Sequence, residues 1–439
     1  MIAEPVTEVL VIGGGPAGSA TALRLAQSGH QVALLDRDRF PREKACSEYM
    51  SPETVRQLAV LGVLDTIDAA GGASLDGTRV FGPLGHSLVG RFANAGGTPF
   101  RKTGLGLSRA VLDATLLRAA EAAGVTVHEA TTVTDLTRDA NGAITGACAR
   151  DANGEIREWG ARIVVGADGL GSVVARRAGL HARGRLRRVA FVAHVAGVEG
   201  LSATTELHVG RQGYVGINAI GGGVANVAVV VPAHRAVEAR GDATAFFWTE
   251  IESVPALRDR FDRSLALSAA RGLRTSSSTN TGGPSPSLRS GSGRGECKLI
   301  RPVMVTGPFD AMARRSTTDG ALLVGDAADF FDPFTGEGIC CALRGAELAA
   351  AAIDEALQHS GPITAARLRG YRAARRRAFL GKWIVERTIG YGMLVPALFD
   401  RAVARLERRG LADTLIGVTG HFVSPWRVVN PWFVARAVL

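Results

Sequence analysis

Apolar runs and a helix-like pattern alternate over the first 36 residues of the chain. The segment 8–12 is an almost continuous apolar run beside glycines, which is typical of a parallel strand buried on both faces. After the glycine-rich segment 13–18, residues 19–29 place small and apolar residues at helical spacing and end in a glycine. A second apolar run, 31–36, ends in an aspartate. Together these segments predict a βαβ unit.

Further helical and strand-like patterns follow in the middle of the chain. Residues 108–123 form an amphipathic helix, with Ser108 as its N-cap and a glycine as its stop. Residues 187–231 alternate around glycine turns, which predicts antiparallel strands in a second layer. Helical patterns dominate after Asp326. Other strand-like runs lie at 125–129, 132–137, 143–149 and 161–165.

Composition places the chain among ordinary globular proteins, with 439 residues of which 46% are hydrophobic and 21% charged. Its five cysteines are few and scattered, which excludes a disulfide framework and predicts no metal site. Residues 1–15 lack a basic segment before an apolar core, so we expect a cytoplasmic protein. The stretch 275–298 contains almost no apolar side chains, which predicts a flexible low-complexity loop.

Positive charge exceeds negative charge by 10, with 51 Lys and Arg against 41 Asp and Glu. Much of the excess lies in two arginine clusters, within 183–188 and 372–377. Neither cluster is interleaved with aromatic side chains, and no nucleic-acid motif accompanies them. We therefore expect no nucleic-acid partner and interpret the clusters as solvated faces.

The glycines between the first strand and helix form a dinucleotide-binding fingerprint. Gly13, Gly15 and Gly18 open the helix, and Asp36 ends the next strand, where its carboxylate can accept hydrogen bonds from a ribose. Glycines without a Cβ let a pyrophosphate approach the free N–H groups and the positive dipole at the helix N-terminus. The segment therefore predicts an ADP-containing cofactor.

Three later segments complete a resemblance to a known superfamily. They are Leu107–Asp113, Ala167–Ser172 and Gly325–Ala328, the last followed by DFFDPFTGEGI. In this order, the motifs resemble those of FAD-dependent oxidoreductases of the aromatic-hydroxylase and geranylgeranyl-reductase superfamily. The resemblance extends from residue 7 to about residue 350.

The resemblance implies an α/β (α+β) fold with a Rossmann-like FAD-binding domain, an antiparallel-sheet substrate domain and a helical C-terminus. We expect a discontinuous FAD-binding domain and a substrate domain that is also split. The predicted boundaries are 1–70, 102–180 and 299–360 for the first, 71–101 and 181–274 for the second, and 361–439 for the helical region.

The resemblance also implies which residues bind FAD, which we expect to be held non-covalently. One group would hold the ADP part and phosphates, and another would face the ribityl chain and the isoalloxazine. Asp168 and Gly169 match a motif linked to both FAD and NAD(P)H. The full expected set is Gly13, Gly15, Pro16, Ala17, Gly18, Asp36, Arg37, Arg42, Lys44, Ala45, Cys46, Arg109, Asp168, Gly169, Gly325, Asp326, Pro333, Gly336, Glu337, Gly338 and Ile339.

The segment 40–52 resembles the reductase-type loop beside the flavin, in which two glycines follow a cysteine. This chain keeps Cys46 but has Ser47 and Glu48 at the glycine positions. Either Cys46 is redox-active or it is a small packing residue. Glu48 and Tyr49 are candidates for proton handling, or else form a hydrogen-bonding wall. With Pro333, these residues are the candidate catalytic set: Cys46, Glu48, Tyr49 and Pro333.

Three chemistries use this scaffold, and the motifs alone leave two of them open. We favour an NAD(P)H-dependent monooxygenase that hydroxylates a largely apolar aromatic, polyketide-like or quinone substrate. The alternative is a geranylgeranyl-reductase-type enzyme that reduces prenyl or other C=C bonds. Halogenation is disfavoured because the five tryptophans contain no Trp-x-Trp pair. A non-catalytic FAD-binding protein also fits, since the motifs establish binding only.

The expected partners are a small apolar substrate and either NAD(P)H or an electron-donor protein. His194 and His208 lie in the predicted substrate sheet, where we interpret both as structural groups. The C-terminal helices either cap the flavin domain or present an amphipathic surface for weak peripheral membrane contact. In the second case Arg375, Arg376 and Arg377 would favour anionic lipid.

Overall fold

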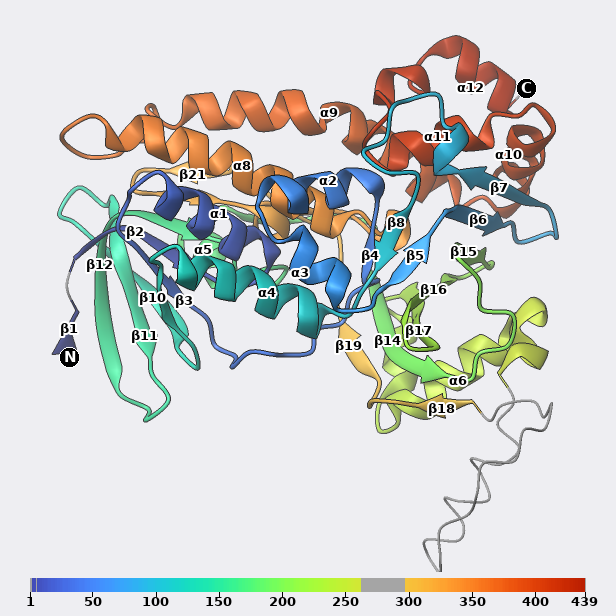
Figure 1. Ribbon diagram of the computed structural model, residues 1–439, viewed down its shortest axis with the longest axis horizontal. Helices are drawn as coiled ribbons and strands as arrows, with labels where there is room; N and C mark the ends of the chain where they lie inside the picture. Colours follow the sequence, from blue (N-terminus) through green and yellow to red (C-terminus); the bar gives the residue numbers. More distant parts are fainter. Residues whose placement is uncertain (1, 5, 262–296, 439) are drawn as a thin grey trace, which may run out of the picture.

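A computed structural model describes residues 2–4, 6–261 and 297–438 of the chain. A nine-stranded sheet and an eight-stranded sheet form its two ends, and the long helices α8 (Gly338–Leu357) and α9 (Arg369–Gly392) run along one side (Figure 1). Most of the predicted loop 275–298 lies outside the described residues. Its last two residues do not belong to a loop, because Cys297 is buried and Lys298 begins β18 (Lys298–Leu299).

The nine-stranded sheet contains the predicted βαβ unit. Its main strand order is β10-β11-β12-β2-β3-β9, and the central strand β2 buries Val9, Leu10 and Val11 completely. Strand β12 begins earlier than expected, because its first half pairs antiparallel with β11 while its second half pairs parallel with β2 and β22. The strands are β1 (Ile2–Ala3), β2 (Thr7–Ile12), β3 (Val32–Leu35), β9 (Thr126–His128), β10 (Thr132–Arg138), β11 (Ile144–Arg150), β12 (Ile156–Gly166), β21 (Thr317–Thr318) and β22 (Ala321–Leu323).

Helices α1 (Pro16–Gln27), α4 (Arg109–Ala122) and α8 (Gly338–Leu357) pack together against this sheet. Fully buried Ala20, Ala22 and Leu25 of α1 face them. Two shorter helices, α2 (Pro52–Val60) and α3 (Leu64–Ala69), extend the same core, and α5 (Val173–Arg177) lies near β10. This packing fixes the glycine-rich turn before α1.

The eight-stranded sheet is the predicted second layer. It is mainly antiparallel, but β6 and β15 pair in parallel, which the prediction of an antiparallel sheet missed. The reason is that β6 and β7 come from far upstream and join the edge of the sheet. Its outer face packs against Phe247 and Ile251 of α6 (Ala243–Ser253). The strands are β6 (Gly77–Phe81), β7 (Ser87–Arg91), β14 (Arg188–Ala196), β15 (Thr204–Val209), β16 (Tyr214–Gly221), β17 (Val224–Pro232), β18 and β19 (Met304–Thr306).

Two small sheets connect the ends. One joins β4 (Tyr49–Met50), β8 (Gly104–Gly106) and β5 (Ala73–Leu75). The other joins β13 (His181–Arg183), β20 (Ala311–Ala313) and β23 (Asp329–Phe330).

The C-terminal helices are α9 (Arg369–Gly392), α10 (Pro396–Arg408), α11 (Ala412–Thr419) and α12 (Pro431–Val438). Helix α9 packs against α8, as a cap on the flavin domain would, whereas α10 and α11 cover β7 of the second sheet instead. Arg375 is buried in an ion pair with Asp329, so it is not part of a basic surface. No helix among the described residues is long and apolar enough to cross a membrane.

Candidate functional site

The glycine-rich turn between β2 and α1 assigns different roles to its glycines. Gly13 has a φ of +104°, and a Cβ there would lie 2.5 Å from the carbonyl oxygen of Ala167. A Cβ on Gly18 would lie 1.8 Å from the carbonyl oxygen of Gly13. These two glycines are therefore needed for the chain's own packing. Gly15 has no such contact, so the space above it is left for a ligand.

Two guanidinium groups face that space. A Cβ on Gly15 would lie 3.6 Å from Nη2 of Arg42 and 3.7 Å from Nη2 of Arg109. Asp113, fully buried, orients both: it accepts two hydrogen bonds of 2.7 Å from Arg109 and pairs with Arg42 at 3.0 Å. Burial by itself lowers the pKa of Arg109. The Asp113 carboxylate outweighs this effect and holds the pKa of Arg109 above its ordinary value. Two cations beside a helix N-terminus fit a pyrophosphate.

Asp36 stands at the end of β3, as the fingerprint predicts. Its Oδ2 accepts a hydrogen bond of 2.6 Å from the Gly14 N–H, and its Oδ1 accepts one of 2.8 Å from the Asp38 N–H. The carboxylate thus orders the glycine-rich turn and keeps lone pairs for a ribose hydroxyl. The neighbouring Arg37 side chain is 75% exposed and pairs only loosely with Asp38 at 3.7 Å.

Asp168 and Gly169 lie at the end of β12 but have separate surroundings. The Asp168 carboxylate accepts hydrogen bonds of 2.6 Å from the Ser172 hydroxyl and from the Val173 N–H, so it caps α5. Burial raises the pKa of Asp168. Gly169 instead faces the interior cleft, where the Lys44 ammonium group lies 3.3 Å from the position of a Cβ.

Lys44 and Asp326 both line the wall of the cleft, and the charge of each affects the pKa of the other. Burial lowers the pKa of Lys44 and raises that of Asp326, and each charge opposes the shift of the other. Gly325 (φ +60°) positions Asp326, because a Cβ there would lie 2.8 Å from the Cβ of Ala17 on α1. Both polar groups are therefore placed for a ribityl hydroxyl or a phosphate.

The segment before α8 is a short 3-10 helix, Pro333–Thr335, followed by Gly336 in the left-handed conformation (φ +71°). A Cβ on Gly336 would lie 2.7 Å from the Tyr49 ring. Asp332 fixes the start of the segment, because it accepts hydrogen bonds of 2.9 Å from Arg188 and 2.6 Å from the Tyr214 hydroxyl. Sequence reasoning missed this brace and placed Arg188 on a solvated face, although it is buried.

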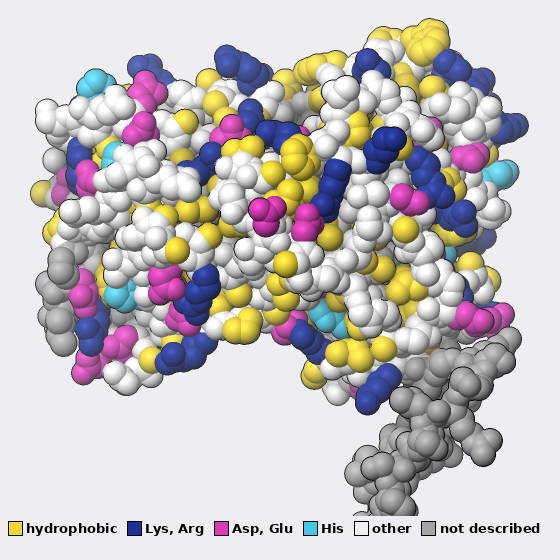
Figure 2. Space-filling model, viewed as in Figure 1, with side chains coloured by type: hydrophobic (Ala, Val, Ile, Leu, Met, Phe, Trp, Pro, Cys, Tyr) yellow, Lys and Arg dark blue, Asp and Glu magenta, His cyan; other side chains and the backbone are white. Residues whose placement is uncertain are grey.

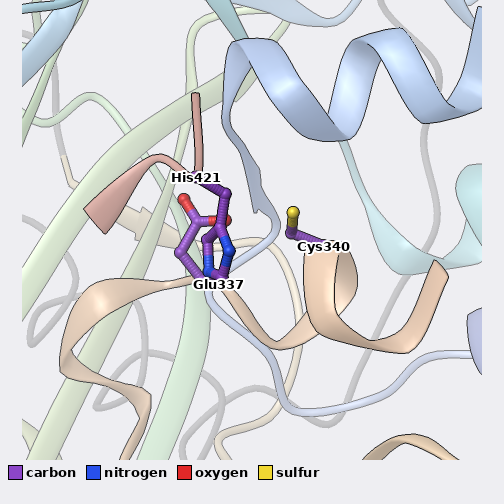
Figure 3. A group of neighbouring side chains, drawn as sticks. All are labelled: Glu337, Cys340 and His421. Carbon is purple, nitrogen blue, oxygen red and sulfur yellow. The ribbon is translucent and has the colours of Figure 1, made fainter. Parts of the chain in front are cut away.

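Glu337 is the N-cap residue of α8, and it is not among the residues that line the cleft. The atoms of Glu337, Cys340 and His421 that could ligate a metal ion lie within 4.8 Å of one another (Figure 3). Burial raises the pKa of Glu337 to about 8 and lowers the pKa of His421 to about 3, the latter with help from Lys382. A neutral carboxyl group beside a cationic lysine opposes a metal ion there.

Cys46, Glu48 and Tyr49 differ in their placement. Cys46 and Tyr49 line the cleft. Glu48 is fully buried at φ +56°: its Oε1 accepts a hydrogen bond of 2.7 Å from the Arg109 N–H, and its Oε2 contacts His194 Nε2 at 2.6 Å. Glu48 is thus a brace between the loop and the second sheet, and His194 has the structural role expected of it.

The cleft joins the Gly15 cradle to the inner face of the eight-stranded sheet. It encloses about 1420 Å³, including its opening to solvent. Predicted site residues on its walls are Gly15, Pro16, Ala17, Lys44, Ala45, Cys46, Tyr49, Arg109, Gly169, Asp326, Pro333, Gly336, Gly338 and Ile339. The other predicted residues do not line the cleft, namely Gly13, Gly18, Asp36, Arg37, Arg42, Glu48, Asp168, Gly325 and Glu337.

Known proteins are similar to this chain in sequence or in fold. The chain is 26% identical over 442 residues to conditioned medium factor receptor 1 of Dictyostelium discoideum, covering 96% of this chain and 78% of that protein. It is 29% identical over 375 residues to digeranylgeranylglycerophospholipid reductase 1 of Methanothermobacter thermautotrophicus, covering 83% and 81%. The flavin-dependent brominase Bmp2 shares the fold, with a TM-score of 0.75, 21% identity and coverage of 96% and 97%.

A family model described as FAD binding domain matches residues 6–269, which is more than half of the 439 residues. This match covers the glycine-rich turn, Arg109 and Gly169, and so agrees with the motifs that predicted FAD. The chain therefore belongs to the FAD binding domain family and is an FAD-dependent oxidoreductase.

Proposed function

We propose that the protein reduces a carbon–carbon double bond of a largely apolar substrate. The observation that carries this proposal is the position of Tyr49 on the wall of the cleft, where its hydroxyl interacts with the buried carboxyl group of Glu337. The proposal is supported by the likeness to a digeranylgeranylglycerophospholipid reductase over 83% of the chain. The sequence motifs alone favour a monooxygenase over a reductase, and this proposal reverses that preference.

The residues around the cleft have distinct roles in binding FAD non-covalently. Gly15, Arg42, Arg109 and the N-terminus of α1 would hold the pyrophosphate, and Asp36 the ribose. Lys44 and Asp326 would hold the ribityl chain. The walls that would face the isoalloxazine are Cys46, Tyr49, Pro333, Gly336, Gly338 and Ile339. When bound and reduced by NAD(P)H, FAD would supply the hydride.

Reduction of C=C needs a proton as well as a hydride: the π bond breaks, and one C–H bond forms at each carbon. Tyr49 is placed to donate that proton. Burial, then the neighbouring Glu337, raises the pKa of Tyr49 well above its ordinary value, so the hydroxyl stays protonated. Because its own pKa is raised to about 8, Glu337 carries a proton at neutral pH and can return one to Tyr49.

Hydroxylation is the second candidate. A phenol hydroxylase needs a base on the cleft wall to deprotonate the substrate. Glu206 lines the cleft, but its carboxylate is tied to Arg260 at 2.6 Å and to His208 at 2.7 Å. This commitment favours reduction over hydroxylation. In either case NAD(P)H is the proposed reductant, and it would dock transiently because the sequence has one dinucleotide fingerprint.

The test compares Tyr49→Phe with Tyr391→Phe, a matched change at a half-exposed tyrosine of α9. We expect Tyr49→Phe to keep FAD and to lower kcat for anaerobic NADPH-dependent reduction of a prenylated substrate by roughly 10²-fold or more, as for loss of a general acid. Tyr391→Phe should leave kcat unchanged. An unchanged kcat in Tyr49→Phe would exclude this residue as the proton donor.

A further inference from the structure

A row of polar side chains crosses the inner face of the eight-stranded sheet. On neighbouring strands, Asn226 of β17 lies opposite Asn218 of β16, and Thr205 of β15 lies opposite Thr78 of β6. Because Glu206 pairs with Ile217 in antiparallel register, Thr205 is also next to Asn218 across the strands. All four residues line the cleft. With strands about 4.8 Å apart, the row extends for roughly 14 Å.

The rest of this floor is apolar. Side chains two positions apart on a strand point to the same face. Two positions from the polar row, the cleft is lined by Ala228, Gly216 and Leu207, and on the neighbouring strand β14 by Val192. Several of these residues pack with Phe309 and Phe330 at the side of the flavin loop. The floor therefore has a broad apolar part and a single polar edge, which suits a ligand of the same two-part character.

The polar row has hydrogen-bonding capacity that the protein does not use. The Asn226 amide nitrogen donates to the Cys46 carbonyl oxygen at 2.9 Å and to Glu48 at 3.0 Å, which fixes the orientation of the amide. In the part of the chain that the structure describes, no hydrogen-bond partner lies near Asn226 Oδ1 or Thr205 Oγ1. Asn226 is only 1% exposed, and buried polar groups are almost always partnered.

We propose that this row binds the polar edge of the substrate, which carries at least one O–H or N–H donor on an otherwise apolar body. The inference deepens the proposed function, since it takes the occupant of the cleft to be the substrate. Asn226 Oδ1 accepts the donor, while Asn218 and Thr205 serve the same edge. A pure hydrocarbon segment would bury these polar groups without forming hydrogen bonds to them, and each unpaired group would weaken binding.

The test is a binding measurement on the FAD-loaded protein and needs no turnover. Perturbation of the flavin absorption spectrum reports binding of 4-phenylphenol, which has an O–H donor, and of 4-methoxybiphenyl, its methyl ether, which has none. The wild type should bind the phenol at least roughly 10-fold more tightly, as expected for a buried hydrogen bond. If the protein prefers the phenol but does not reduce a double bond, the proposed function is wrong and the proposed role of the polar row still holds.

Two variants remove part of the row, Thr205→Val and the double variant Thr205→Val/Asn218→Leu. Both keep Asn226, and the second also removes the long hydrogen bond of 3.4 Å that the Asn218 amide donates to the Ala219 carbonyl oxygen. The preference for the phenol should fall in the first variant and fall further in the second, with a remainder that Asn226 Oδ1 supplies, and both variants should retain FAD. The control Val192→Ala, in the apolar part of the floor, should weaken both probes and keep their ratio. The proposal is overturned by a wild-type ratio near one, by absence of binding of either probe, by an unchanged ratio in the double variant, or by loss of FAD from the variants.

Discussion

Replacing Gly15 with valine separates cofactor binding from folding. Gly15 has φ −74° and ψ −176°, a conformation open to any residue. A Cβ there would meet only the two guanidinium groups, at 3.6 Å and 3.7 Å, which is ordinary van der Waals contact. We therefore expect Gly15→Val to fold with a melting temperature close to that of the wild type.

FAD affinity should fall steeply in the same variant, because the valine methyl groups occupy the space between Arg42, Arg109 and the α1 N-terminus. Loss of two charge-assisted hydrogen bonds, at about 1.5–3 kcal/mol each, amounts to roughly 3–6 kcal/mol. That is a decrease of roughly 10²-fold to 10⁴-fold in affinity.

The assay is titration of apoprotein with FAD, followed by flavin fluorescence, with circular dichroism melting beside it. The matched control is Gly370→Val, because Gly370 in α9 has nothing within 4 Å of a Cβ. Gly370→Val should keep full FAD affinity. Tight FAD binding by Gly15→Val would show that the pyrophosphate does not lie above this glycine.

Other perturbations follow from buried groups and exposed surfaces. Glu48→Leu removes the carboxylate that the Arg109 N–H, His194 and Asn226 contact. At 1–3 kcal/mol per buried group, urea denaturation should show that the free energy of unfolding falls by about 3 kcal/mol or more. An unchanged urea midpoint would show that Glu48 does not brace the loop against the second sheet. Because the folded-state pKa of Glu337 is raised to about 8, the folded protein binds its proton more tightly than the unfolded chain, and stability is lost as pH rises from about 4.5 to 8. Glu337→Gln should flatten this slope, by up to about 5 kcal/mol over the range; an identical slope would contradict it. Around α12, Trp426 and Trp432 are 57% and 64% exposed, and Figure 2 shows hydrophobic side chains among Lys and Arg on this end of the molecule. We expect salt-sensitive sedimentation with anionic liposomes that Trp426→Ser/Trp432→Ser abolishes, and no sedimentation at low salt would remove membrane contact from the account.

Local sequence patterns predicted the parts of the fold that depend on neighbouring residues. The βαβ unit follows from apolar runs around the 13–18 turn, and the helix after Ser108 from its own periodicity. The resemblance then placed Tyr49 and Gly336 beside the cofactor, and the structure brings them into contact. These features need only short-range order or a known motif.

Long-range pairing explains what the sequence did not show. The sequence predicts either proton transfer or a hydrogen-bonding wall for Glu48, and its three partners come from α4, β14 and β17. The sequence predicts surface charges at Arg188 and Arg375, yet both side chains are buried and each pairs with an aspartate from the segment before α8. Asn218 and Asn226 carry no motif, and only strand register aligns them.

The mass of the product formed under ¹⁸O₂ tests the central claim most directly. Wild-type protein with FAD, NADPH and a prenylated phenol should give a product heavier than the substrate by two hydrogens, with no ¹⁸O. In ²H₂O, at least one deuterium should enter, from the proton that Tyr49 donates. A product that gains one ¹⁸O atom and no hydrogens would contradict the account and identify the protein as a monooxygenase.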